Sequence, residues 1–337
     1  MAGRVCVVTG GNAGIGKATA TALAQQGAHV VLACRCPTKG SAACGEIRRK
    51  VPGATVETLP LDLESVSSIR GFVQRFRETS LPLHLLVNNA AIMTGKPETA
   101  RGMEKTMVVN HLGPFLLTNL LLPDLRKSAS SPPTAGGDTT RDPSSTSENV
   151  PGNLPRASRI VNVSSRLEKR GTVLVAKNPA LAPGPAWFQQ APGEHDTFSV
   201  YSSSKLCNLM FSFELDRRLS ALATTPSSGG GGGGLVTVNA VTPGIVNTSI
   251  GDCTIKNRWL RWAAPSLKAL LMRRVEKGAE TVVWAAASPD VEGVGGKFFG
   301  DLQEVPCSET SKDEVLGRRM WEASEIAADL DESERVL

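Results

Sequence analysis

The chain has 337 residues, 41% hydrophobic and 20% charged, which is typical of a soluble globular protein. Its formal charge of +5 comes from 37 basic against 32 acidic residues, and no basic run or aromatic pattern argues for nucleic acid. Seven cysteines without a CxxC pair and four separated histidines indicate neither a disulfide framework nor a metal site. With no apolar run near the ~20 residues that span a bilayer and no signal peptide pattern, we expect a cytoplasmic protein.

Apolar, β-rich runs alternate with helical patterns along the chain. The expected strands are 4–10, 29–34, 54–62, 83–91, 158–165, 235–241 and 296–300, and the expected helices include 16–27, 38–51, 65–79 and 113–127. Strands that are apolar throughout and separated by helices predict a parallel sheet covered on both faces. The expected fold class is therefore α/β, a Rossmann-type doubly wound parallel sheet of about seven strands in a single domain over residues 1–330.

Two segments have the composition of loops. Residues 128–157 are rich in Ser, Pro, Gly and Thr, and residues 224–234 include a run of glycines. Both follow a helix and precede a strand, which in a right-handed βαβ unit places them at the amino edge of the sheet, whereas ligands bind at the carboxyl edge. We expect both to be disordered loops remote from the chemistry.

The stretch TGGNAGIG (9–16) follows the first strand and opens a helix. Glycines there allow a tight turn and a close approach of the backbone to a pyrophosphate at the helix N-terminus, where N–H groups favour anions. The alternative is an ordinary strand–helix turn, but the position after the first strand favours dinucleotide binding. The residues expected to bind the cofactor in this turn are Gly10, Asn12, Gly14, Ile15 and Gly16.

The end of the second strand indicates which dinucleotide binds. The chain reads LACRCPTK there, with Arg35 and Lys39 where an acidic residue would accept the ribose 2′-hydroxyl of NAD. Arginine suits a 2′-phosphate because its planar guanidinium binds phosphate bidentately. We therefore expect NADP(H), with a solvated surface arginine as the alternative.

With these residues assembled, the chain resembles the short-chain dehydrogenase/reductase family over nearly its whole length apart from the two inserts. Besides the glycine turn, the matching motifs are LDL with Asp62, NNAA (88–91) with Asn89 and Ala90, VNHLGPF with Asn110, IVNVSS with Ser165, YSSSK (201–205), and TPGIVNT with Pro243, Gly244, Val246 and Thr248. The resemblance implies that Asp62 lies beside the adenine and that TPGIVNT lies beside the nicotinamide. Ala91 departs from the family's usual glycine.

The only tyrosine of the chain, Tyr201, stands four residues before Lys205 on an expected helix. Residues four apart share a helix face, so the two side chains are expected to lie together. A nearby ammonium group and an oxidised nicotinamide ring both favour the phenolate, so we expect the tyrosine pKa to lie below its usual value of ~10. Tyr201 is then placed to give a proton to a carbonyl oxygen or to take one from an alcohol.

The resemblance implies roles for the other members of this set. Ser165 would hold the reacting oxygen, Asn110 would hold a water that links Lys205 to solvent, and Lys205 would also bind the nicotinamide ribose. Taken singly, Ser165 is alternatively a turn cap and Asn110 a buried amide bonded to backbone. Because the residues occur in order on one fold, we interpret Asn110, Ser165, Tyr201 and Lys205 as a catalytic set.

Within the family, segments such as VVLACR, SKLCNLMFSFEL and GKFFGD resemble the retinol dehydrogenase and protochlorophyllide reductase branch. This resemblance implies NADP(H) and an apolar substrate, namely a retinal-like or long-chain aldehyde or ketone and its alcohol. Two departures are noted: many retinol dehydrogenases carry an N-terminal membrane anchor that this chain lacks, and Asn88 stands where protochlorophyllide reductases usually have cysteine. A non-catalytic NADP(H)-binding sensor or scaffold, and a protochlorophyllide reductase-like enzyme, are the alternative functions.

Two segments near the expected site have open interpretations. Trp187 and Phe188, in the long loop 166–200, either wall an apolar substrate or anchor the loop on the core. The amphipathic stretch 257–274 is a substrate lid, a peripheral membrane contact or an ordinary core-packing helix. The resemblance also implies a homodimer built on the helix that begins at Tyr201.

Overall fold

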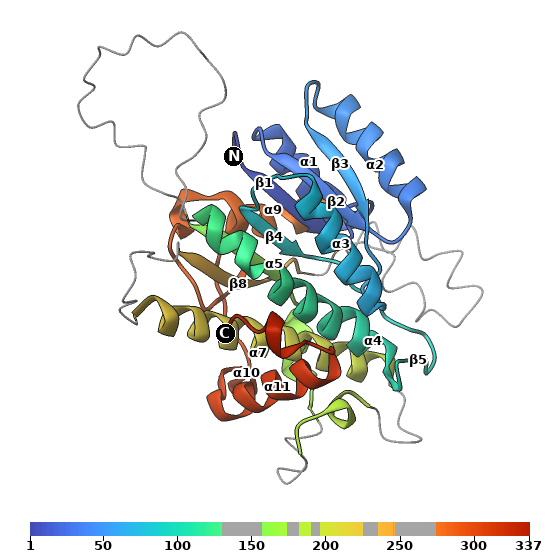
Figure 1. Cartoon of the computed structure of the whole chain (residues 1–337), viewed down its shortest axis with the longest axis vertical. Helices are drawn as coiled ribbons and strands as arrows, with labels where there is room; N and C mark the ends of the chain where they lie inside the picture. The colour runs from blue at the N-terminus through green and yellow to red at the C-terminus, as the bar shows by residue number, and fades with distance from the viewer. Residues whose placement is uncertain (130–156, 174–181, 190–195, 225–234, 245, 247–273) are drawn as a thin grey trace.

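The computed structural model describes residues 1–129, 157–173, 182–189, 196–224, 235–244, 246 and 274–337 (Figure 1). The strands are β1 (Val5–Thr9), β2 (His29–Cys34), β3 (Val56–Pro60), β4 (Leu85–Asn88), β5 (Thr99–Ala100), β6 (Met103–Glu104), β7 (Ser158–Val163), β8 (Val236–Thr242), β9 (Lys297–Gly300) and β10 (Gln303–Glu304). The α-helices are α1 (Gly14–Gln25), α2 (Pro37–Lys50), α3 (Val66–Glu78), α4 (Lys105–Met107), α5 (Gly113–Ala129), α7 (Thr197–Thr224), α9 (Val275–Ala287), α10 (Glu309–Lys312) and α11 (Glu314–Ala327). The short helices are η1 (Val108–Leu112), η2 (Arg166–Arg170), η3 (Pro185–Phe188), η5 (Pro289–Val291) and η6 (Glu332–Glu334).

The main sheet has the strand order β10-β9-β8-β7-β4-β1-β2-β3. All seven strands expected from the sequence are present, and neighbours among them pair in parallel. An eighth strand, β10, pairs antiparallel with β9 and is only two residues long. The strand order reverses between β1 and β4, so the crevice for a ligand is expected at the carboxyl ends of these two strands.

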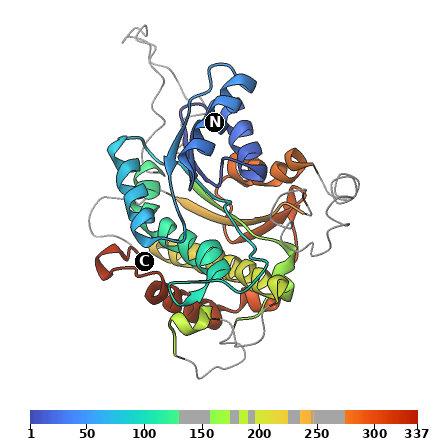
Figure 2. The ribbon, with the colours of Figure 1, turned by 90° about the vertical axis from the view of Figure 1, so that its right-hand side faces the viewer.

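Helices cover both faces of the sheet (Figure 2). One layer, of α1, α2 and α9, buries side chains such as Leu23, Ile47 and Val282 against the sheet. The other layer, of α3, α5 and α7, has its own apolar cluster, which includes Phe72 and Phe115. The doubly wound α/β fold is thereby confirmed, because continuous apolar strands can be buried on both faces only between two such layers.

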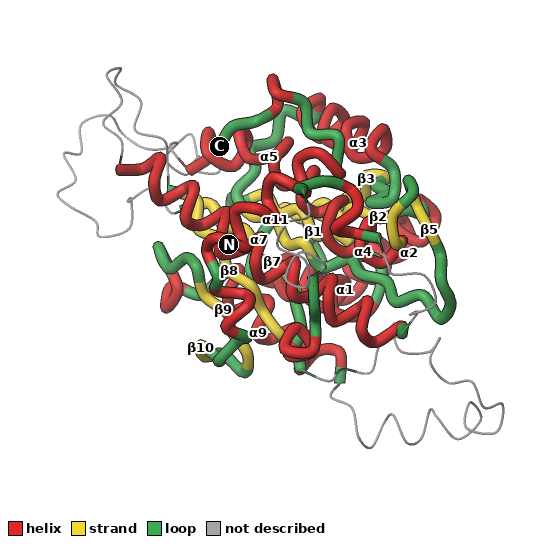
Figure 3. The backbone as a smooth tube through the Cα atoms, turned by 90° about the horizontal axis from the view of Figure 1, so that it is seen from below, coloured by secondary structure: helices red, strands yellow, loops and turns green. Residues whose placement is uncertain are grey.

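The C-terminal helices form a further cover over the second layer. Helices α10 and α11 contact α7, and α11 and α7 lie together in the view from below (Figure 3). The Trp321 ring lies 4.9 Å from that of Phe115 and 5.8 Å from that of Phe211, and the Arg218 guanidinium stacks 4.4 Å from the Trp321 ring. The chain's own C-terminus therefore covers the helix on which a homodimer was expected.

The two inserts lie outside the described residues apart from their ends. Ala129 ends α5, Ala157 precedes β7 and Thr224 ends α7. The Ala157 N–H donates to Glu292 Oε1 (2.8 Å) and its carbonyl accepts from Arg4 Nη2 (2.7 Å). These bonds fix the point where the chain enters β7, at the amino edge of the sheet.

Candidate active site

The turn after β1 requires glycine in two different ways. Gly10 has φ of 64°, in the left-handed region that a side chain disfavours. At Gly16 a Cβ atom would run into Asn89 Nδ2 and the Gly10 carbonyl. The first turn of α1 is thus packed directly on the loop after β4, and its N–H groups are left pointing out of the helix N-terminus.

Thr9 joins this turn to the NNAA segment. Its hydroxyl oxygen accepts from the backbone N–H groups of Asn89 (2.9 Å) and Ala90 (3.0 Å), and the Asn89 side chain donates to the Thr9 carbonyl (2.9 Å). Thr9 is completely buried. It was absent from the residues predicted to form the site, although its position as the last residue of β1 was a usable signal.

The adenine side of the expected site lies at the ends of β2 and β3. Arg35 and Lys39 are exposed, and within the described residues neither forms an ion pair. Asp62 is partly buried, with Oδ1 accepting from the Glu64 N–H (3.1 Å) and its own N–H donating to Ser68 Oγ (2.9 Å). The sheet therefore brings these residues to the same edge as the glycine turn.

Lys205 connects α7 to the end of β7. Its Nζ donates to the Val163 carbonyl (2.8 Å), and its own carbonyl accepts from Ser164 Oγ (2.8 Å). The same Nζ lies 5.5 Å from the centre of the Tyr201 ring. Lys205 is 2% exposed and has no acidic partner among the described residues, so its ammonium is a buried charge held by a neutral carbonyl.

Asn110 lies in η1, a π-helical segment. Such segments are rare in proteins, and those that occur are often found at functional sites. Its amide donates to the Ile92 carbonyl (2.9 Å) and accepts from the Ile92 N–H (2.8 Å). It also donates to Ser204 Oγ (3.1 Å), which in turn donates to the Tyr201 carbonyl (2.7 Å). The Asn110 amide is thus buried and bonded to backbone, and it is linked through Ser204 to the turn of helix that carries Tyr201.

Ser165 follows β7 and begins η2. Its Oγ accepts from the Leu167 N–H (3.2 Å), so the turn-cap alternative also holds. The cap uses the oxygen only as an acceptor, and the hydroxyl proton remains available for donation. Neither Ser164 nor Ser204 was predicted, because nothing in a run of serines shows which of them will be buried.

Burial shifts both titratable groups of the pair toward their neutral forms. It raises the pKa of Tyr201 to about 12 and lowers the pKa of Lys205 to about 8. The expectation of a lowered Tyr201 pKa is therefore wrong for the protein without its cofactor, because desolvation of the phenolate raises this pKa. At neutral pH Tyr201 is therefore a protonated phenol.

The segment after β8 is described only in part. Pro243 is partly buried, Gly244 has φ of 75°, and the buried Val246 contacts the Gly278 position of α9. Thr248 lies outside the described residues, as does the amphipathic stretch apart from Arg274.

Trp187 and Phe188 lie in η3 and are 3% and 1% exposed. The Trp187 indole donates to the Ala182 carbonyl (2.9 Å), and the Phe188 ring lies 5.6 Å from that of His111. Both belong to the apolar cluster on the α5 and α7 side of the sheet. They anchor the loop on the core, which decides between the two alternatives left open by the sequence.

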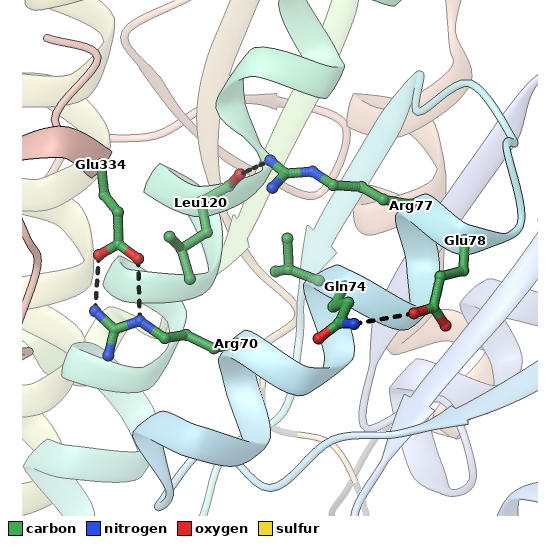
Figure 4. A pocket seen from close by; sticks show the side chains of 7 residues that line it. Arg70, Gln74, Arg77, Glu78, Leu120 and Glu334 are labelled. Atoms are coloured by element: carbon green, nitrogen blue, oxygen red, sulfur yellow. Dashed lines mark hydrogen bonds and ion pairs between the residues drawn. The ribbon is translucent and has the colours of Figure 1, made fainter.

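A hollow of about 530 Å³ lies on the outer surface between α3, α5 and η6 (Figure 4). Its charged groups are paired: Arg70 with Glu334 (2.7 Å), and Arg77 with the Leu120 carbonyl (2.7 Å) and Asp124 (2.9 Å). None of the residues predicted for the site lines it, so we do not assign the chemistry to it.

Within the described ranges, no cluster of His, Cys, Asp or Glu could hold a metal ion, and no helix is long and apolar enough to cross a membrane.

Fold and site together define a Rossmann-type domain, a doubly wound parallel sheet with a glycine turn between β1 and α1. The family model for short chain dehydrogenase matches residues 4–131. Polyprenol dehydrogenase of Mus musculus is 37% identical over 95% of this chain and 82% of its own length, and Retinol dehydrogenase 14 of Mus musculus is 33% identical over 97% and 86%. The crystal structure of an uncharacterised protein from Mycobacterium paratuberculosis matches 97% of this chain and 94% of its own with a TM-score of 0.65 and 28% identity. The chain therefore belongs to the short-chain dehydrogenase family, in its retinol dehydrogenase-like branch.

Proposed function

We propose that this protein is an NADP(H)-dependent oxidoreductase that interconverts an apolar carbonyl compound, such as a retinal-like or long-chain aldehyde or ketone, and its alcohol. The observation that carries the proposal is the buried Lys205, whose Nζ lies 5.5 Å from the centre of the partly buried Tyr201 ring, at the carboxyl edge of the sheet. An unpaired buried ammonium beside a protonated phenol is costly for stability, and such arrangements concentrate at catalytic sites. The substrate class follows the names of the relatives, which are dehydrogenases of polyprenol and retinol.

The residues present fit a nicotinamide dinucleotide. Gly10 and Gly16 have no room for a side chain, so the turn stays tight and the N–H groups at the N-terminus of α1 would bind the pyrophosphate. Lys205 has donor capacity beyond its bond to Val163, which suits ribose hydroxyls. Asp62, Asn89, Ala90, Asn12, Ile15 and the segment from Pro243 to Thr248 would complete the contacts, as the family resemblance implies. When bound, the reduced nicotinamide supplies a hydride.

In the reductive direction, Tyr201 donates its phenolic proton to the carbonyl oxygen of the substrate. Ser165 donates a hydrogen bond to the same oxygen, since its cap to Leu167 uses only a lone pair. The positive charge of Lys205 stabilises the phenolate that remains on Tyr201. Asn110 fixes the helical turn of Tyr201 through Ser204.

The activity is expected to depend on the charge of Lys205. Because the Lys205 pKa is about 8, raising the pH through that value removes the ammonium that stabilises the phenolate, and kcat/KM for carbonyl reduction falls. The Tyr201 pKa of about 12 lies too high to cause this loss. A pH profile of kcat/KM tests this, and a profile that stays flat well above pH 8 would contradict it.

The cofactor preference is expected to depend on Arg35. Charge-assisted hydrogen bonds to a phosphate are worth about 1.5–3 kcal/mol, so Arg35→Glu is expected to raise the KM for NADPH about 10–100-fold. The KM for NADH, which lacks the 2′-phosphate, is expected to stay the same or fall. Arg49→Glu, the same charge reversal at an exposed position near the end of α2, is the matched control and leaves both values unchanged. An equal effect of the two substitutions on NADPH would refute the assignment.

The function itself is tested by NADPH oxidation in the presence of retinal, a long-chain aldehyde and a steroid ketone, with the alcohol product identified by chromatography. Stoichiometric NADPH loss and alcohol formation with at least one of them is the expected result. Tight NADPH binding without turnover of any of them would favour the sensor or scaffold function instead.

A further inference from the structure

The turn that follows Ser165 is attached to the C-terminal segment of the chain through a buried carboxylate. Glu168, in η2, is completely buried. Its Oε1 accepts from the Ser308 N–H (3.0 Å) and its Oε2 from the Ser308 hydroxyl (2.6 Å). Within the described residues, the Glu168 carboxylate accepts hydrogen bonds only from these two neutral donors. Burying a carboxylate without a cation costs free energy.

The same turn is held on its other side by α7. A Cβ atom at Gly171 would lie 2.5 Å from the Ser202 carbonyl, so the end of η2 packs against the backbone of α7 next to Tyr201. The Thr172 N–H donates to Ser203 Oγ (3.0 Å), one residue further along that helix. The turn of Ser165 is therefore clamped between the helix of Tyr201 and the segment that contains Ser308.

Glu168 is also connected directly to Ser165. Its backbone N–H donates to the Ser165 carbonyl (3.1 Å), and its own carbonyl accepts from the Gly171 N–H (2.8 Å). A displacement of Glu168 would thus rotate the short helix that Ser165 caps. Ser308 itself is fixed as the N-cap of α10, where its Oγ accepts from the Ser311 N–H (3.3 Å).

We propose that Glu168 is a positioning residue which, through Ser308, sets the place of the Ser165 hydroxyl relative to Tyr201. The proposal rests on the function proposed above and extends it to the C-terminal segment, which then forms part of the catalytic framework. Glu168 would not touch the substrate, and its effect would pass through Ser165. Because a misplacement of about 1 Å can cost on the order of 10²-fold in rate, loss of the clamp should appear in kcat.

The test compares Glu168→Ala, Glu168→Gln and Ser308→Ala in steady-state reduction of the best carbonyl substrate. Glu168→Ala is expected to lower kcat on the order of 10²-fold, with NADPH affinity and substrate KM nearly unchanged. Ser308→Ala, which removes only one donor, is expected to lower kcat in the same sense and by less. Glu168→Gln keeps an acceptor for the Ser308 N–H and is expected to restore most of the activity.

The control is Glu292→Ala. Like Glu168, Glu292 accepts hydrogen bonds from one backbone N–H, that of Ala157, and from one side chain, that of Arg159. Unlike Glu168, it lies at the amino edge of the sheet, away from Ser165. It is expected to lower thermal stability without changing kcat. An equal loss of kcat in this variant would show that general destabilisation accounts for the Glu168 result.

The decisive comparison repeats Glu168→Ala in a Ser165→Ala background. If Glu168 acts through Ser165, the second substitution adds almost no further loss of kcat, whereas a full, independent loss in both backgrounds would overturn the proposal. Unchanged kcat in soluble Glu168→Ala and Ser308→Ala would overturn it as well. A wild-type protein that turns over no carbonyl substrate would instead remove the proposed function, and this proposal with it.

Discussion

Replacing Tyr201 with phenylalanine is expected to lower kcat for carbonyl reduction by about 10²–10⁴-fold, the range that general acid catalysis contributes. Phenylalanine keeps the ring that lies 5.5 Å from Lys205 Nζ and removes only the hydroxyl, and the chain has no other tyrosine to replace it. NADPH affinity is expected to stay nearly unchanged, because the proposed cofactor contacts lie on other residues. The measurement is kcat by NADPH oxidation together with an NADPH binding titration.

The matched control is Ser199→Ala, which removes an exposed hydroxyl two residues earlier on the same helix. It is expected to leave kcat at the wild-type level. Retention of a large share of the wild-type kcat in Tyr201→Phe would show that another group donates the proton.

Replacing Gly16 with alanine is expected to abolish measurable NADPH binding. The added methyl group would collide with the Gly10 carbonyl and with Asn89 Nδ2, which donates to the Thr9 carbonyl. The Gly10 carbonyl belongs to the turn and Asn89 is bonded to the end of β1, so the collision must displace the backbone that is proposed to bind the pyrophosphate. Overpacking of this kind costs about 1–3 kcal/mol, so the free energy of unfolding should fall as well. A binding titration and a thermal melt measure the two effects.

Gly45→Ala serves as its control. Gly45 lies inside α2 with nothing within 4 Å of a Cβ atom, so alanine there is expected to stabilise the protein by roughly 0.5–1 kcal/mol and to leave NADPH binding intact. Normal NADPH affinity in Gly16→Ala would mean that the turn after β1 does not hold the cofactor.

The fold could be predicted from the sequence because its strands are continuous apolar runs, a pattern that only a sheet covered on both faces explains. Two features could not. Strand β10 and the β5–β6 hairpin are two residues per strand, too short for any periodicity. The cover of α11 over α7 depends on Trp321 meeting Phe115 and Phe211, a contact between distant parts of the chain.

The candidate site shows the same division. Lys205 Nζ lies near the Tyr201 ring and bonds to the end of β7, Asn110 in η1 bonds to Ser204 of α7, and Ser165 follows β7, while the catalytic role of the set stays a prediction. For the protein without its cofactor, the Tyr201 pKa was predicted in the wrong direction, because this pKa depends on burial and the sequence shows only the neighbouring charge. The hydrogen bonds of Thr9, Ser164 and Ser204 were missed for a related reason: whether a small polar side chain is buried is decided by tertiary packing.

Transfer of the hydride from NADPH to the carbonyl carbon can be followed directly with a deuterium label. The wild-type protein is incubated with retinal and NADPH that carries deuterium at the transferable position of the nicotinamide, and the alcohol is analysed by mass spectrometry. The expected product is retinol with one deuterium on the former carbonyl carbon, formed in step with NADPH loss and almost absent with Tyr201→Phe. Alcohol without the label, or formed equally well by Tyr201→Phe, would contradict it.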